Sequence, residues 1–284
     1  MRVHFDDIGG AMTRFIRAGQ GPSVLLLHGV GMTADSWCRT LGPLSRDFDV
    51  IAPDLLDNGF TGAGSYVGGP PHDAILDHLE SLIDYLGLGS FCVVGSSFGA
   101  TLAVMLHLRR PDQVKRLVIT SSGSVFKKAE ALVRMYEQSF ANGSVALRDP
   151  TLEICRKRLG NIFHDPSKIP EELLLLQLTP YALPHALAAY ERRLRGMMDL
   201  EAMRRHEVGD RLKEVKAPML AVWGKQDPRG EHAQAVEVFG AIPNARLVSF
   251  DACGHLPHLE CADRFNPLVR EFLITEAPFG KEKA

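Results

Sequence analysis

The sequence predicts an open, mostly parallel α/β sheet that is interrupted by a long helical segment. Short apolar runs without polar alternation recur along the chain, and such runs are typical of strands buried on both faces. Helical periods separate them up to residue 124, whereas residues 125–216 contain helical patterns and no convincing strand. The alternation of strand and helix favours right-handed parallel connections, and the break in it favours an all-helical insertion.

The predicted elements follow in order along the chain. Residues 3–8 and 12–18 flank Gly9-Gly10 and are expected to form an opening hairpin. Six apolar strands are expected at residues 24–27, 49–54, 91–95, 116–120, 218–224 and 245–250. Together with the two strands of the hairpin, they make eight. Helices are expected at residues 34–44, 74–86, 100–110, 129–140, 152–161, 170–178, 185–196, 199–215, 231–242 and 257–275, with a glycine-rich loop at 55–71 and a tail from 276.

Composition limits the classes of function. The chain has 284 residues, 45% of them hydrophobic, and a net charge of −2, which favours a soluble protein with one large core and argues against nucleic-acid or membrane partners. The first residues lack an apolar signal core, and five dispersed cysteines suggest reduced thiols, so a cytoplasmic location is expected. No metal-ligand spacing is visible, and no cofactor or metal is predicted. Self-association into a homo-oligomer stays open.

The segment Gly95-Ser96-Ser97-Phe98-Gly99 lies between a predicted strand and a predicted helix. A G-x-S-x-G segment in this context places its serine on a sharp turn, and the two glycines relieve crowding around it. A serine-rich turn also caps helices in proteins without catalytic activity. The segment therefore makes Ser97 a candidate nucleophile that needs support from the rest of the chain.

That support comes from two later strand ends. Asp227 follows the strand at 218–224, and His255 follows the strand at 245–250, so the chain order is Ser, Asp, His. A neutral imidazole can take the proton of a serine hydroxyl, and a carboxylate fixes the tautomer of the imidazole. Asp251 and His258 are the rivals of Asp227 and His255. Asp251 is too close to His255 in sequence, and His258 begins the last helix, so both are expected to lie outside the site.

Together with His28-Gly29, these motifs cover nearly the whole chain, and the sequence resembles serine hydrolases of the α/β-hydrolase fold superfamily. The resemblance implies a core of residues 1–124 and 217–284, with a helical cap or lid at 125–216. It implies that Ser97 is the nucleophile, His255 the general base and Asp227 its orienting carboxylate, while the backbone N–H groups of Val30 and Phe98 form the oxyanion hole. The expected substrate is a small molecule, and the candidate pocket residues are His28, Gly29, Ser96, Leu256 and Tyr181.

The segment from Cys253 to Asn266 is similar to that of meta-cleavage-product hydrolases, which cut carbon–carbon bonds. That family typically has Asn where this chain has Ser96 and Trp where it has Leu256. A hydrolase of a small to medium, partly apolar ester or lactone is therefore ranked first, and a carbon–carbon hydrolase of a diketone second. A third alternative is a non-catalytic ligand receptor of the same fold.

The helical segment is expected to shape the substrate pocket. Its leucines at 173–176, with Tyr181, are expected to supply an apolar wall over Ser97. Arg192, Arg193 and Arg195 could bind an acidic substrate, although a solvated helix face is the favoured interpretation.

Overall fold

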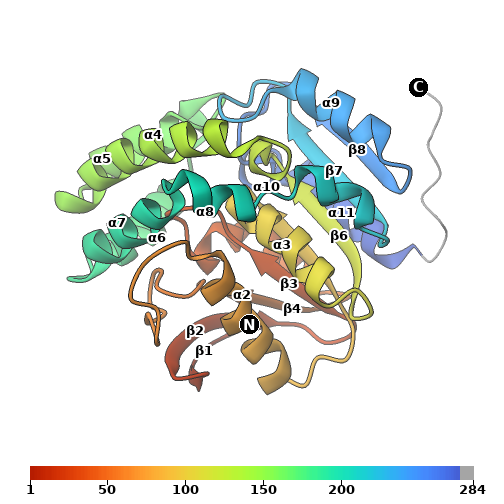
Figure 1. The fold of residues 1–284 in the computed structure, drawn as a ribbon, viewed down its shortest axis with the longest axis horizontal. Coiled ribbons are helices and arrows are strands. Elements are labelled where there is room, and N and C mark those ends of the chain that lie inside the picture. Colours follow the sequence, from red (N-terminus) through yellow and green to blue (C-terminus); the bar gives the residue numbers. More distant parts are fainter. Residues whose placement is uncertain (276–284) are drawn as a thin grey trace.

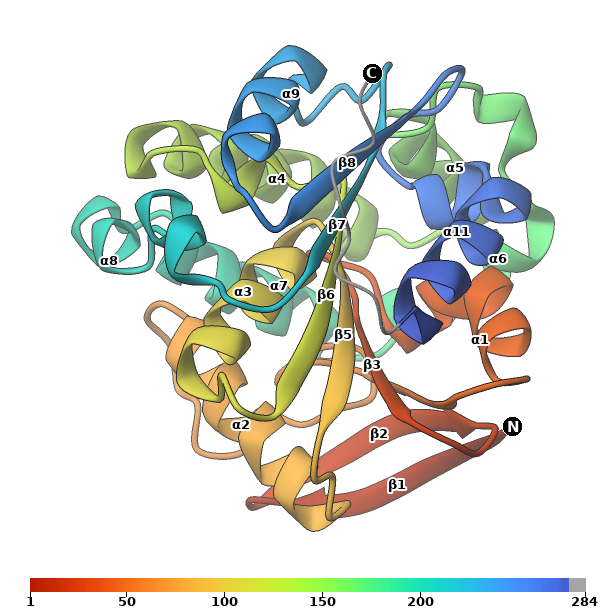
Figure 2. The same cartoon turned by 90° about the vertical axis from the view of Figure 1, so that its right-hand side faces the viewer.

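The computed structural model describes residues 1–275 and contains one eight-stranded sheet of order β1-β2-β4-β3-β5-β6-β7-β8. Strand β2 runs antiparallel to both β1 and β4, and every other neighbouring pair is parallel. Figure 2 shows the strands fanning across the molecule with a pronounced twist. The strands are β1 (Arg2–Ile8), β2 (Ala11–Ala18), β3 (Ser23–Leu27), β4 (Asp49–Pro53), β5 (Phe91–Ser96), β6 (Val114–Thr120), β7 (Met219–Gly224) and β8 (Ala245–Phe250). The predicted α/β-hydrolase fold is confirmed.

The apolar runs are buried on both faces of the sheet, as their composition predicts. In β3, Leu25 and Leu27 face one hydrophobic core, whereas Val24 and Leu26 face a second core on the opposite side. Because side chains alternate across a strand, a strand covered on both faces needs an apolar residue at every position.

Helices cover both faces of the sheet. The core that contains Leu25 also holds residues of α2 (His72–Tyr85) and α3 (Phe98–Arg109), together with Ala235 and Phe239 of α9 (His232–Ala241). The opposite core holds residues of the short helix η1 (Ala34–Trp37), of α1 (Cys38–Leu44) and of α11 (Ala262–Ile274). The predicted final helix at 257–275 is divided, because Cys261 leaves the helical conformation between α10 (Pro257–Glu260) and α11.

Five α-helices lie between β6 and β7 in the chain, and we refer to them as the inserted helices. They are α4 (Ala129–Arg148), α5 (Leu152–Gly160), α6 (Glu171–Tyr181), α7 (Ala186–Met197) and α8 (Leu200–Arg205). Figure 1 shows α4 to α7 stacked on one side of the molecule. Short helical turns accompany them: η2 (Gly123–Val125), η3 (Pro166–Lys168) and η4 (Gly209–Glu214).

Two inserted helices differ from their predicted lengths. Helix α4 continues past residue 140 through Gly143, where a Cβ atom would lie 2.2 Å from the hydroxyl of Tyr190, so the glycine allows α7 to pack closely. The predicted helix at 199–215 ends at Arg205 and resumes only as η4.

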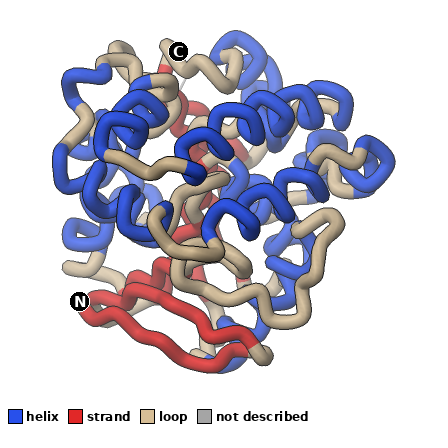
Figure 3. The backbone as a smooth tube through the Cα atoms, turned by 90° about the vertical axis from the view of Figure 1, so that its left-hand side faces the viewer, coloured by secondary structure: helices blue, strands red, loops and turns tan. Residues whose placement is uncertain are grey.

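The β1–β2 hairpin forms one edge of the molecule, away from most helices (Figure 3). The predicted tail from residue 276 lies outside the described residues. Within residues 1–275, the helices are too short or too polar to cross a lipid bilayer.

Candidate active site

Ser97 occupies a strained turn between β5 and α3. Its backbone has φ 53° and ψ −120°, a region that L residues rarely adopt and that functional sites commonly stabilise. Cβ atoms added to the flanking glycines would meet backbone oxygens, at 2.4 Å for Gly95 and 2.2 Å for Gly99. The turn therefore needs glycine on both sides of Ser97, as the sequence motif predicts.

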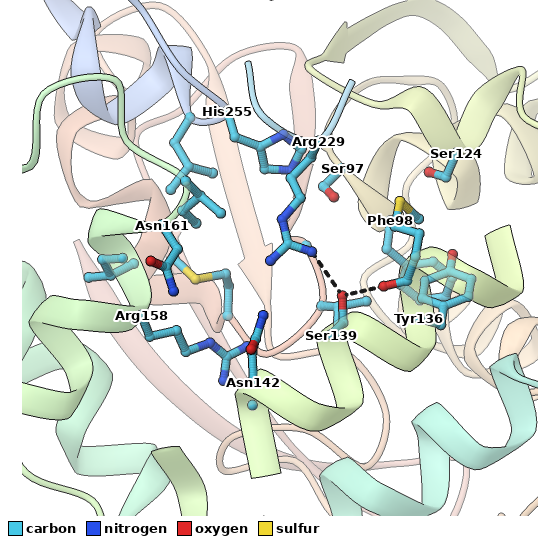
Figure 4. A pocket seen from close by; sticks show the side chains of 18 residues that line it. Ser97, Phe98, Ser124, Tyr136, Ser139, Asn142, Arg158, Asn161, Arg229 and His255 are labelled. Carbon is cyan, nitrogen blue, oxygen red and sulfur yellow. Dashed lines mark hydrogen bonds between the residues drawn. The ribbon is translucent and has the colours of Figure 1, made fainter. Parts of the chain in front are cut away.

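The Ser97 hydroxyl faces the cavity at the carboxyl ends of the strands (Figure 4). Among residues 1–275 it has no hydrogen-bond partner, so it is free to meet a bound molecule. His255 lines the same cavity. Hydrogen bonds between a nucleophile and its base commonly tighten only when substrate is bound.

Asp227 and His255 form a buried pair beside Ser97. The Nδ1 atom of His255 lies 2.9 Å from Oδ1 and 3.0 Å from Oδ2 of Asp227, whose side chain is 0% exposed. Asp227 Oδ1 also accepts a hydrogen bond from the backbone N–H of Arg229 at 2.8 Å. The carboxylate thus fixes the ring and leaves Nε2 as the only ring nitrogen available to another group.

The two rival residues are placed differently. Asp251 is 74% exposed and pairs with Lys225 at 2.8 Å. His258 is fully buried against Trp37, with 4.3 Å between ring centroids. Neither of its ring nitrogens has a hydrogen-bond partner in the part of the chain that the structure describes. Neither rival lines the cavity that contains Ser97.

The buried His258 makes a prediction about acid stability. Burial, and then the neighbouring His255, lower the pKa of His258 from 6.5 to about 3. Because the folded pKa lies below the unfolded value, His258 contributes its full stability above pH 6.5, and this stability is lost as the pH falls towards 3. Between pH 7.5 and 5 its contribution amounts to ~2 kcal/mol. His258→Phe should reduce the loss of unfolding free energy over this range by that amount in urea titrations.

The matched control is His164→Gln, because His164 is exposed. This variant should keep the acid sensitivity of the wild type. An unchanged pH dependence in His258→Phe would contradict a neutral, buried His258.

The loop after β3 approaches Ser97 closely. A Cβ atom on Gly29 would lie 3.1 Å from the Cβ atom of Ser97. Within residues 1–275, no hydrogen-bond acceptor engages the backbone N–H of Val30 or of Phe98, the first residue of α3. Free N–H groups near a helix N-terminus favour negative charge, so this corner of the cavity suits an oxyanion.

His28 holds the shape of this loop. Its Nε2 accepts a hydrogen bond from the backbone N–H of Leu55 at 3.0 Å, which leaves Nδ1 as the donor to the carbonyl of Gly29 at 2.8 Å. Burial lowers the pKa of His28 to about 4, so the ring is neutral at physiological pH. His28 is therefore a structural residue and lies outside the lining of the Ser97 cavity, contrary to its place among the candidate pocket residues.

The inserted helices hold the same loop from above. The carbonyl of Gly31 accepts hydrogen bonds from Tyr181 Oη at 2.8 Å and from Gln177 Nε2 at 3.1 Å, both on α6. The Asn58 side-chain amide donates to the carbonyl of Met32, and Asn58 Oδ1 accepts from Arg193 of α7 at 2.6 Å. Tyr181 and Arg193 thus lie neither in the wall of the Ser97 cavity nor on a solvated face, and they fasten helices α6 and α7 to the loop that carries Val30.

Removing the Tyr181 hydroxyl should therefore lower turnover without unfolding the protein. Tyr181→Phe keeps the ring but loses one hydrogen bond to Gly31, an interaction of about 1 kcal/mol. We expect kcat to fall roughly two- to tenfold, with a melting temperature within a few degrees of the wild type. The control is Thr179→Ala, on the exposed side of α6, whose hydroxyl bonds only within its own helix. Equal kcat values in both variants would contradict a role for Tyr181 in holding the loop.

The cavity around Ser97 takes its apolar wall from residues other than those that the sequence predicts. Gly29 and Leu256 line it, but Ser96 and Tyr181 do not, and the leucines at 173–176 do not reach it. Leu173 and Leu174 are buried against other helices, and Leu175 is 57% exposed. Polar groups face the cavity from α4, from α5 and from the loops that follow α5 and β7 (Figure 4), namely Ser139, Asn142, Arg158, Asn161 and Arg229.

Glu260 holds the loop of His255 in place, and the sequence motifs do not reveal it. Its carboxylate accepts backbone hydrogen bonds from Gly254 at 3.0 Å, from Leu256 at 3.1 Å and from His164 at 2.8 Å. The backbone N–H of His255 itself donates to the carbonyl of Ile162 at 2.8 Å. The loop that carries His255 is thereby fastened to the segment after α5. Only the spacing of Glu260, six residues after Gly254, could have indicated this role.

Comparison with known proteins is consistent with this arrangement. A family model described as alpha/beta hydrolase fold matches residues 22–262. A 2-hydroxy-6-oxononadienedioate/2-hydroxy-6-oxononatrienedioate hydrolase of Pseudomonas putida is 30% identical over 281 residues, covering 96% of this chain and 92% of the relative. The crystal structure of a meta-cleavage product hydrolase from Pseudomonas fluorescens is 27% identical with a TM-score of 0.76, covering 95% of this chain and 97% of its own.

A thermophilic esterase from Thermogutta terrifontis has a TM-score of 0.76 at 22% identity, covering 96% of this chain and 98% of its own, which shows the shared fold alone. The family match, the sheet order and the strained serine turn agree with one another. This chain belongs to the alpha/beta hydrolase fold family.

Proposed function

We propose that Ser97, His255 and Asp227 form a catalytic triad that hydrolyses a small organic substrate. The observation that carries this proposal is the buried Asp227–His255 pair beside a serine in a strained turn. Asp227 fixes the ring of His255, and Nε2 is then the base that takes the Ser97 proton. The N–H groups of Val30 and Phe98 receive the negative charge that develops on the carbonyl oxygen.

The reaction proceeds in two halves. Ser97 Oγ bonds to the substrate carbonyl carbon, and the bond to the leaving group breaks while His255 returns the proton to that group. Water, activated by the same imidazole, then releases the acid from Ser97. The scheme serves a carbon–carbon bond as well as an ester, provided that the departing atom can hold an electron pair.

For the substrate we infer a carbon–carbon bond next to a ketone, as in a 2-hydroxy-6-oxo-dienoate. Support comes from the relatives of Pseudomonas putida and Burkholderia vietnamiensis, each 30% identical over 96% of this chain and named as hydrolases of such compounds. In this reaction the dienol first becomes a ketone, and a proton is added to one of the two carbons of the scissile bond. Ser97 attacks the other carbon, and the protonated carbon then departs with the electron pair as a conjugated enolate, whose oxygen takes up a proton.

Ester hydrolysis, which is ranked first on the sequence motifs alone, is now the second candidate. Leu256 favours it, since this residue lines the cavity where meta-cleavage-product hydrolases typically have Trp. Ser96, the other departure from that family, is buried and does not line the cavity, so it bears little on the choice of substrate. The relatives move the carbon–carbon reaction to first place.

The test compares 2-hydroxy-6-oxohepta-2,4-dienoate with 4-nitrophenyl esters on the purified protein. The proposal predicts a higher kcat/KM for the dienoate, followed by loss of its dienol absorbance, and no activity in Ser97→Ala. Faster turnover of the esters would reverse the ranking. A folded protein that turns over neither substrate and is not labelled at Ser97 by a fluorophosphonate would instead be a ligand receptor.

A further inference from the structure

Two arginines reach the cavity of Ser97 from separate parts of the chain. Arg158 lies on α5, and Arg229 lies on the loop after β7, two residues beyond Asp227. Figure 4 shows both guanidinium groups on the polar side of the cavity, near Asn142 and Ser139. Neither arginine belongs to the motifs that identify the triad.

Arg158 is held by aromatic rings and keeps an unmet donor. Its guanidinium lies over the rings of Tyr181 and Tyr190, with 5.1 and 5.3 Å to the ring centroids. Its Nη1 atom is buried and has no hydrogen-bond partner among residues 1–275. A buried charged donor without a partner is costly, and a ligand group is one way to satisfy it.

Arg229 likewise forms no ion pair within residues 1–275. Among these residues, its Nη1 atom donates only to the hydroxyl of Ser139, at 3.3 Å. Burial, and then the nearby Arg158, lower the pKa of the Arg229 guanidinium. The guanidinium groups of Arg158 and Arg229 therefore repel each other at one cavity.

Several other arginines of this protein, including partly buried ones, are paired with carboxylates. Arg14 pairs with Asp35 at 2.7 Å, and Arg192 pairs with Asp57 at 2.5 Å. Within residues 1–275, no carboxylate forms an ion pair with Arg158 or Arg229, and the cavity that they line has no acidic residue in its wall. The wall of the cavity thus carries two guanidinium groups without an ion-pair partner among the described residues, while the carboxylate of Asp227, which lies outside the wall, acts on Arg229.

We propose that Arg158 and Arg229 form an anion subsite that holds the carboxylate of an organic acid substrate while Ser97 attacks its carbonyl. The planar guanidinium fork matches a carboxylate and holds it more firmly than a neutral group. The subsite rests on the proposed hydrolase function, but it is independent of whether an ester or a carbon–carbon bond is cleaved. It also gives the cavity a direction, with the acid end of the substrate at α5 and the β7 loop.

Binding without turnover tests the subsite directly. Glutarate, dimethyl glutarate and inorganic phosphate are titrated by calorimetry into the Ser97→Ala protein. The proposal predicts that glutarate binds and that affinity falls at least tenfold when Arg158→Gln or Arg229→Gln is added, because each loses charge-assisted hydrogen bonds. Dimethyl glutarate should bind the Ser97→Ala protein no more tightly than glutarate binds the arginine variants. Failure of glutarate to bind, or binding of phosphate alone, would overturn the carboxylate subsite.

Two further variants control for altered folding. Arg229→Lys keeps the charge and should recover part of the lost affinity, which a merely structural role would not explain. The second control is Arg156→Gln. Arg156 lies on α5, as Arg158 does, but it is 46% exposed and pairs with Glu171 at 3.5 Å. This variant should bind glutarate as the Ser97→Ala protein does, and an equal loss of affinity in it would contradict the proposal.

A kinetic comparison separates the subsite from the hydrolase function. Wild-type protein should hydrolyse 4-nitrophenyl hydrogen glutarate with a kcat/KM at least tenfold above that of its methyl ester. Arg158→Gln and Arg229→Gln should remove this preference mainly through KM. Equal rates for acid and methyl ester would overturn the subsite while leaving the hydrolase intact. Glutarate binding without hydrolysis of either ester or of the dienoate would uphold the subsite and overturn the hydrolase.

Discussion

Ser97→Ala is expected to reduce kcat on the preferred substrate by a factor on the order of 10⁵–10⁶, the scale seen when the serine of a triad is removed. The substitution deletes the only atom that can form the covalent intermediate. It should leave the fold intact, because the Ser97 hydroxyl has no hydrogen-bond partner within residues 1–275 to lose. Steady-state kinetics and thermal unfolding of the same preparation measure both effects.

Ser96→Ala is the matched control for this variant. The Ser96 hydroxyl is buried next to Ser97 and also lacks a hydrogen-bond partner among the described residues. This variant should retain kcat within a few-fold of the wild type. If Ser97→Ala kept a tenth of the activity, Ser97 would not be the nucleophile.

Asp227→Asn is expected to lower kcat by about 10⁴, the second-largest effect. The amide oxygen can still accept a hydrogen bond, but the negative charge that stabilises the imidazolium is lost, and the amide group can favour the wrong tautomer of His255. KM should change far less than kcat, because Asp227 does not line the cavity. Measurement of kcat and KM on one substrate separates the two parameters.

Asp251→Asn tests the rival carboxylate in the same assay. Asp251 lies close to His255 in sequence but is exposed and paired with Lys225. Its variant should retain wild-type kcat within about threefold, since surface ion pairs contribute little. A loss of kcat comparable to that in Asp227→Asn would contradict the assignment of the orienting role to Asp227.

The sequence predicts those parts of the molecule that depend on local pattern. The runs around Leu25 and Val93 identify strands buried on both faces, because no exposed strand tolerates such continuity. The glycines around Ser97 identify the turn, since larger residues would meet backbone oxygens there. The pairing of Asp227 with His255 follows from strand ends that meet at one edge of the sheet.

Other parts depend on packing that no local pattern encodes. The leucines at 173–176 have a clear helical period, but a period does not say which surface the helix faces, and these leucines do not form the wall over Ser97 that was predicted for them. Arg158 and Arg229 are far apart in sequence, and only the folded structure shows that α5 and the loop after β7 line the same cavity. In the sequence, Glu260 resembles any acidic residue of a helix, and only the structure shows the three backbone N–H groups that donate to it.

The bonds from α6 to the carbonyl of Gly31 bear on attempts to exchange substrate preference between relatives. A chimaera that replaces residues 125–216 with the matching segment of another hydrolase would import a new pocket roof and also remove Gln177 and Tyr181, which hold the loop of Val30. The grafted segment would need its own donors at these two places. Without them, the recombinant protein would bind the intended compound and still lack an ordered hole for the oxyanion. Substrate preference can therefore be exchanged only when the inserted helices keep their hydrogen bonds to the carbonyl of Gly31.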